Sequence, residues 1–127
     1  MNGARRAAMF VLAIFFILAG ANHFAHPGVY ERIVPAWLPA PRLLVAISGA
    51  CEILGGAGVL FSSTRRFAGI GLIALLVAVF PANLYMAQNP GLYADLGTPA
   101  LFYARLPLQP LLIAWVWWVC LFRRGTI

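Results

Sequence analysis

Residues 48–58 read SGACEILGGAG, a stretch that places one acidic residue in the middle of a long apolar segment crowded with small side chains. Ser48, Glu52 and Gly56 recur at every fourth position and share one face of the expected helix. The glycines of the stretch allow neighbouring backbones to approach closely, which is the packing that membrane helices favour. We therefore predict a central membrane helix that carries Glu52.

The rest of the composition agrees with a membrane protein. The chain has 127 residues, of which 63% are hydrophobic and 9% are charged, far below the charge content of a soluble domain. A helix needs roughly 20 apolar residues to cross a bilayer. We predict an all-α fold in which residues 1–127 form a single transmembrane domain, a four-helix bundle with partly structured outer loops. The predicted spans are residues 7–25, 43–63, 67–88 and 106–122.

The arginines predict the orientation of this bundle. Positively charged residues near span ends accumulate on the cytoplasmic side, and six arginines here form three pairs on one predicted face. The other three lie on the opposite face, so both termini are predicted to be cytoplasmic, in a bacterial inner membrane. The pairs are Arg5 and Arg6, Arg65 and Arg66, and Arg123 and Arg124, and the single arginines are Arg32, Arg42 and Arg105.

Polar residues in the four spans fall at similar depths. Counting from the arginine pairs at about 1.5 Å per residue, Glu52 and Gln109 lie roughly 20 Å from that face. His23, Asn83 and Arg105 lie about one helical turn further on. Polar side chains inside hydrocarbon are costly and usually mark a functional site. We therefore predict a buried polar site at this level.

Within this level we predict that Arg105 points inward and pairs with Glu52, either directly or through Gln109 or water. Without a partner, burial favours the neutral acid form of Glu52. The alternative is that the polar groups only join helices, since hydrogen bonds between membrane helices are common and contribute about 0.6 kcal/mol each. That alternative suits Asn83 and Gln109 best and Glu52 least.

The connections on the predicted outer side are rich in proline, glycine and aromatic residues. Residues 26–41 and 89–103 are expected to lie against the outer leaflet and to cap the bundle, with tyrosines and Trp37 at the level of the lipid headgroups. Pro81 is expected to kink the third span below Asn83. Two further prolines, Pro107 and Pro110, fall in the first turns of the fourth predicted span, where proline is tolerated.

Several kinds of chemistry find no support in the sequence. The basic charge reads as a topology signal and predicts no nucleic-acid binding. His23 and His26 have no supporting cysteine cluster, so we assign no metal site. Cys51 and Cys120 differ in predicted depth by roughly 17 Å, beyond disulfide reach. There is no phosphate loop or nucleophile elbow.

The segments from His23 through Gln109 resemble the DoxX-like family of small bacterial membrane proteins, which includes MauE-related members. The resemblance rests on AGANHFAHPGVYERIVPAWLPAP, SGACEILGGAGVLF, TRRFAG, VFPANLYMA and RLPLQPLLIAW, which cover most of the chain in order. It implies a four-helix bundle and an association with membrane redox systems. The dithiol chemistry of the MauE-type relatives does not carry over, because this chain lacks a suitable cysteine pair.

These observations favour an accessory or redox-associated membrane subunit whose polar-lined pocket binds a small amphipathic molecule, with a quinone or a lipid as candidates. Its partners would be the bilayer and a redox subunit or a second copy of the chain. Two alternatives stay open: a membrane enzyme that uses Glu52 and His23 as an acid–base pair on a lipid, and a structural scaffold. No catalytic residue is assigned. The predicted ligand-binding residues are His23, Glu52, Asn83, Arg105, Gln109, Tyr30 and Tyr85.

Overall fold

The computed structural model describes residues 1–122, and within them every regular element is helical. Four of the helices are long and apolar enough to cross a membrane, as the sequence predicts. Two short helical segments occupy the connections at one end of the bundle. The elements are α1 (Gly3–Ala25), α2 (Pro27–Ile33), α3 (Pro41–Val59), α4 (Arg65–Gln88), η1 (Pro90–Tyr93) and α5 (Pro99–Cys120).

The helix that carries the fourth predicted span extends beyond it at the N-terminal end. Helix α5 begins at Pro99 rather than at residue 106, with Thr98 as N-cap accepting a hydrogen bond from the Leu101 backbone amide. Pro107 and Pro110 therefore lie inside the helix and not in its first turn. Arg105 likewise lies well inside α5, which matters for the site. Helix α3 ends at Val59, four residues before the predicted end.

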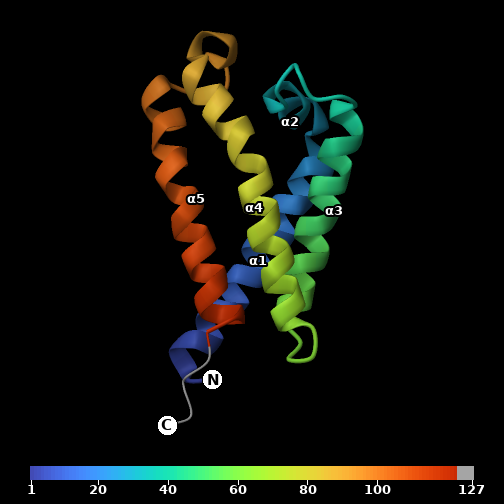
Figure 1. Cartoon of the computed structure of the whole chain (residues 1–127), viewed down its shortest axis with the longest axis vertical. Helices are drawn as coiled ribbons and strands as arrows, with labels where there is room; N and C mark the ends of the chain where they lie inside the picture. The colour runs from blue at the N-terminus through green and yellow to red at the C-terminus, as the bar shows by residue number, and fades with distance from the viewer. Residues whose placement is uncertain (123–127) are drawn as a thin grey trace.

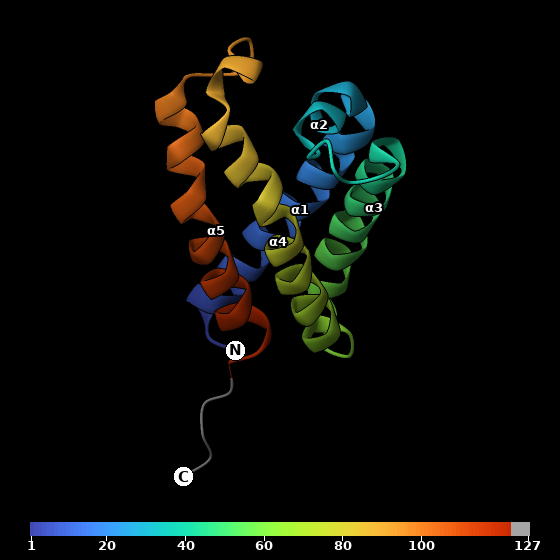
Figure 2. The ribbon, with the colours of Figure 1, turned by 45° about the horizontal axis from the view of Figure 1, so that its top comes forward.

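The long helices associate as two antiparallel pairs. Helix α1 packs along α3, and α4 packs along α5, while α3 and α4 join the two pairs. Figures 1 and 2 both show the pairs close together at the end where α1 begins and splayed apart at the end that carries α2. The bundle is therefore tightly packed at one end and opens toward the other.

Glycines set the close approach of α1 and α3. A Cβ at Gly49 would lie 2.8 Å from the His23 Cβ and 3.0 Å from the Gly20 carbonyl oxygen, and a Cβ at Gly20 would lie 2.6 Å from the Gly49 oxygen. Real side chains do not tolerate such contacts, so these helices can meet here only because both positions lack a side chain. The contact brings α1 directly against the part of α3 that carries Glu52.

Gly49→Val is expected to lower the free energy of unfolding by about 1–3 kcal/mol, the usual effect of overpacking a close contact. Gly71→Val is the matched control, because it makes the same chemical change where a Cβ would meet nothing within 4 Å. Thermal unfolding in detergent measures the difference between the two variants. Equal stability of both would contradict the proposed role of the α1–α3 contact.

The packed end contains an apolar cluster and two arginine contacts. Phe16, Leu12 and Val59 belong to a core that also includes residues of α4 and α5. Arg5 donates hydrogen bonds to the Val119 and Phe122 carbonyl oxygens (3.0 and 2.7 Å), and Arg65 Nε donates to Val59 O (2.8 Å).

These two arginines therefore bind the free carbonyl groups at the C-terminal ends of α5 and α3, where positive charge is favourable. The sequence pattern assigned them only to orientation. Arg123 and Arg124, the third predicted pair, lie outside the described residues.

Candidate functional site

A cavity of about 530 Å³ lies between the two helix pairs and is lined by residues of all four long helices. Its lining is mostly apolar, which is typical of small-molecule sites, with a few polar side chains that come from all four long helices. The five polar residues that the depth comparison selected all line it. They are His23, Glu52, Asn83, Arg105 and Gln109.

One wall, formed by α1 and α3, carries an acid next to an imidazole. His23 Nδ1 lies 3.2 Å from Glu52 Oε2 and 2.8 Å from the Ala19 carbonyl oxygen. Because both neighbours accept hydrogen bonds, the proton of a neutral imidazole is assigned to Nδ1, which leaves Nε2 as an acceptor. The Nδ1 proton is directed to the Ala19 carbonyl oxygen. The buried Glu52 Oε2 therefore lies beside the imidazole but accepts no hydrogen bond from it.

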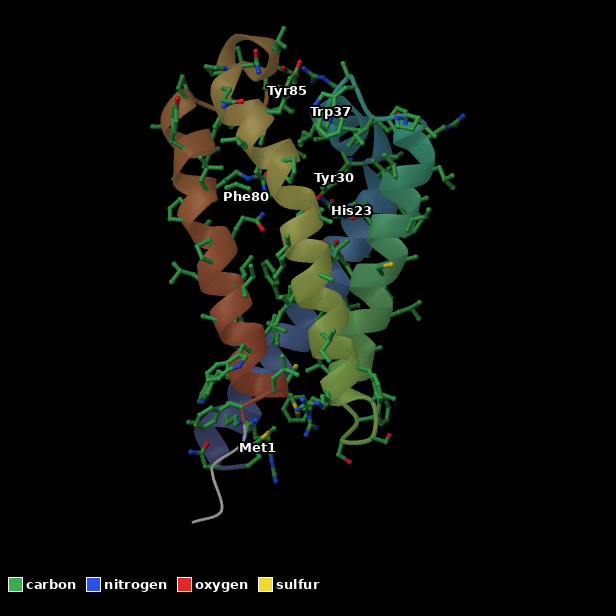
Figure 3. The ribbon with its side chains drawn as sticks, in the orientation of Figure 1. Met1, His23, Tyr30, Trp37, Phe80 and Tyr85 are labelled. Carbon is green, nitrogen blue, oxygen red and sulfur yellow. The ribbon has the colours of Figure 1, made fainter. Side chains whose placement is uncertain are left out.

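Tyr30 fixes the orientation of this imidazole. The two rings stack with centroids 3.9 Å apart and planes at 17°, and Asn22 Nδ2 donates to the Tyr30 hydroxyl at 2.6 Å. Figure 3 shows His23 and Tyr30 together, between α4 and the α1–α3 pair. The short helix α2 therefore acts on the site directly, because it supplies the ring that covers His23.

The opposite wall, formed by α4 and α5, carries hydrogen-bond donors. Asn83 and Gln109 are each 8% exposed, and Arg105 is half-buried one turn from Gln109 on the same face of α5. Within residues 1–122 Arg105 forms no ion pair, and the buried Gln109 Oε1 has no hydrogen-bond partner. This wall therefore holds two buried amides and one positive charge, and that charge has no ion-pair partner among the described residues.

The predicted direct pair of Arg105 and Glu52 was wrong, because Glu52 pairs with His23. Side chains on a helix lean toward its N-terminus. Since α1 and α3 are antiparallel, His23 and Glu52 lean toward each other and close the one-turn difference in their levels. Arg105, on α5, leans along its own helix away from the level of Glu52.

The cavity opens sideways between α3 and α4. Ile47 on α3 and Ala78 on α4 both line the cavity and are exposed on the surface of the bundle, which in a membrane faces lipid. Trp37, which is 70% exposed, borders the same opening from the α2–α3 connection and lies above His23 in Figure 3. A chain-like molecule could therefore leave part of its length outside the polar centre.

A second polar contact joins the two halves of the bundle at the splayed end. Arg32 on α2 binds both carboxylate oxygens of Asp95 (2.7 and 2.9 Å) and also Leu92 O, and the Tyr93 hydroxyl donates to Arg32 O at 2.8 Å. We call Arg32, Tyr93 and Asp95 the latch. The latch tethers α2, and with it Tyr30, to the connection between α4 and α5.

The latch is expected to weaken in acid. The hydrogen bond from Arg32 lowers the pKa of Asp95, so the contribution of this pair is complete above the ordinary aspartate pKa and is lost as pH falls through the lowered value. Hydrogen-exchange protection of residues 27–38, corrected for the pH dependence of the intrinsic exchange rate, should fall over that pH range in the wild type. In Asp95→Asn the protection should be low already at neutral pH and show no such fall. A wild type without the acid response would contradict the assignment.

Sequence reasoning missed the latch, although its members lie in the two predicted outer connections. Tyr93 was expected at the headgroups, but only 4% of it is exposed, and its burial raises its pKa. Tyr85, predicted to bind ligand, does not line the cavity and packs edge-on against Tyr93. Ser48, which the ligand prediction omitted, lines the cavity one turn from Glu52. Its position four residues before Glu52 was the available signal.

Comparison with known proteins gives one match. No curated protein and no solved structure is detectably similar to the chain. A family model described as a domain of unknown function (DUF8561) matches residues 12–120, which include α3, α4, α5, the second part of α1 and every polar residue of the cavity. The chain therefore belongs to the DUF8561 family of uncharacterised domains.

Proposed function

We propose that this membrane protein binds one small amphipathic molecule in the cavity between its helix pairs. The observation that carries the proposal is the convergence of five polar side chains from four helices on one mostly apolar space of about 530 Å³. Helix packing alone does not require such a space. The polar head would lie between the two walls, and the apolar part would extend to the opening between α3 and α4.

The bound molecule would be quinone-like or lipid-like. Arg105, Asn83 and Gln109 can donate hydrogen bonds to carbonyl or other acceptor oxygens, and Glu52 and His23 Nε2 can accept from a hydroxyl. The DoxX-like resemblance adds the proposal that the protein serves a redox complex of the bacterial inner membrane as an accessory subunit, with both termini in the cytoplasm.

The direct test is whether the purified protein is stabilised by amphiphiles that fit the cavity. Unfolding temperatures in detergent would be measured with a decyl-substituted benzoquinone, hexadecanol and hexadecanoic acid. Saturable stabilisation by at least one of them supports the proposal, because a ligand that binds only the folded state raises its stability by mass action. No stabilisation by any of the three would contradict it.

A second candidate is a membrane enzyme, favoured by the 3.2 Å contact between His23 and Glu52. A carboxyl group beside an imidazole of fixed orientation can move a proton to or from a bound lipid. Glu52→Gln separates the candidates, since an enzyme would lose turnover of a bound substrate while the fold is retained. A scaffold would keep its assembly with a partner in this nearly isosteric variant.

A further inference from the structure

We infer that the ligand of this cavity carries an oxyanion head group, such as a carboxylate or a phosphate, and that Arg105 binds it. This inference rests on the proposed ligand-binding function and names the chemical class of the ligand. Its starting point is Arg105, a charged side chain that lines the cavity and has no ion-pair partner among residues 1–122.

No carboxylate among residues 1–122 lies within ion-pair distance of Arg105. The whole sequence has three acidic residues against nine arginines. Asp95 is bound to Arg32, and Glu52 lies beside His23 on the opposite wall. Glu31, on α2, forms no ion pair within residues 1–122. An arginine stays protonated in proteins, so its charge persists whether or not a partner is present.

The position of Arg105 makes the lack of an ion-pair partner significant. Helix α5 begins at Pro99, so Arg105 lies roughly 9 Å along the helix from its start rather than at its end. Its side chain is half-buried and lines the cavity. Charged groups at such positions in membrane helices are costly and are normally paired. An anionic ligand would supply the missing pairing.

The two amides beside Arg105 complete an anion-binding arrangement. Asn83 and Gln109 are more than nine-tenths buried and both line the cavity, and the Gln109 side-chain amide has an oxygen without a hydrogen-bond partner among residues 1–122. Planar guanidinium groups match the geometry of carboxylates and phosphates, and amide N–H groups can bind the remaining lone pairs. Hydrogen bonds to charged groups are the strong ones, so the anion should dominate the affinity.

The test compares matched ligands that differ in charge. Binding of hexadecanoic acid, hexadecanol and methyl hexadecanoate would be measured at neutral pH in a non-ionic detergent. We expect the wild type to bind the acid about 10- to 100-fold more tightly than the alcohol or the ester, the ratio that a charge-assisted hydrogen-bond pair gives. Equal affinities for the three would overturn the inference.

Variants of Arg105 and Arg42 test whether Arg105 causes the preference for the acid over the alcohol and the ester. Arg105→Gln should bring the acid to the affinity of the alcohol, while Arg105→Lys, which keeps the charge, should retain much of the preference. Arg42→Gln removes the same charge from an exposed site outside the cavity and should change nothing. Folding of each variant is checked by its unfolding transition without ligand. A folded Arg105→Gln that keeps the preference would overturn the inference.

Competition identifies the source of the anion. Displacement of hexadecanoic acid by phosphatidylglycerol assigns a bilayer phospholipid, and resistance to displacement assigns a single-chain acid; both support an oxyanion site. The outcome also separates this inference from the proposed function. If hexadecanol or the quinone binds saturably with no preference for the acid, the oxyanion inference fails alone. If nothing binds, both fail.

Discussion

Glu52→Gln is expected to weaken binding of an amphiphile with a hydroxyl head group by about 10- to 100-fold while the helical fold is kept. The carboxyl group lies beside His23 and lines the cavity, and the substitution removes its charge and one acceptor. Loss of a hydrogen bond that involves a charged group reduces affinity by this factor. Titration of the purified variant with hexadecanol, whose hydroxyl can donate to the Glu52 carboxyl group, followed by the shift in unfolding temperature, measures it.

Glu31→Gln is the matched control for this prediction. It makes the same chemical change on α2, at a residue that does not line the cavity and has no ion pair among residues 1–122. The control should bind like the wild type. If Glu52→Gln binds equally well, Glu52 does not contact the head group of the ligand.

The second large effect is expected from filling the cavity. Ala82 lies on α4, next to Asn83, and lines the cavity where it is partly accessible. Ala82→Phe would place a ring in the space that the ligand occupies, so binding should fall by more than about 100-fold whatever the charge of the head group. The unfolding transition without ligand checks that the variant folds, because Ala82 also packs against a buried apolar cluster that includes Met86 and Phe102.

Ala74→Phe provides the comparison for the filled cavity. Ala74 lies two turns earlier on the same helix, is exposed on the bundle surface and does not line the cavity. Ligand titration of the two variants separates a blocked site from a general effect of a new aromatic ring on α4. Retained binding in Ala82→Phe would place the ligand somewhere else.

The number of spans and the shared depth of the polar residues followed from the sequence because both depend on one-dimensional distances. Hydrocarbon thickness sets the length of each apolar run, and the rise of a helix converts residue number into depth. On this basis His23, Glu52 and Asn83 could be expected at one level, and the structure lines one cavity with them.

The partner of Glu52 could not be predicted in the same way, because depth does not say which helices are neighbours or which way side chains lean. Gly20 and Gly49 decide that α1 packs against α3, and the antiparallel direction of the two helices turns His23 toward Glu52. The first two turns of α5 lie outside the predicted span, because their residues follow a connection rich in proline and glycine and show no clear helical pattern.

The latch could not be predicted from the sequence for a different reason. Arg32 and Asp95 lie far apart in the sequence, in two irregular connections that have no periodic pattern. Their contact depends on how the two helix pairs are joined at the splayed end, which no single segment encodes.

The most direct test of the central claim is native mass spectrometry of the purified wild type, Ala82→Phe and Ala74→Phe, with identification of any molecule released. A specific ligand cavity predicts one amphipathic molecule of defined mass per chain in the wild type and in Ala74→Phe, and none in Ala82→Phe. The same adducts on all three proteins, or an empty wild type, would contradict the existence of a ligand site between the helix pairs.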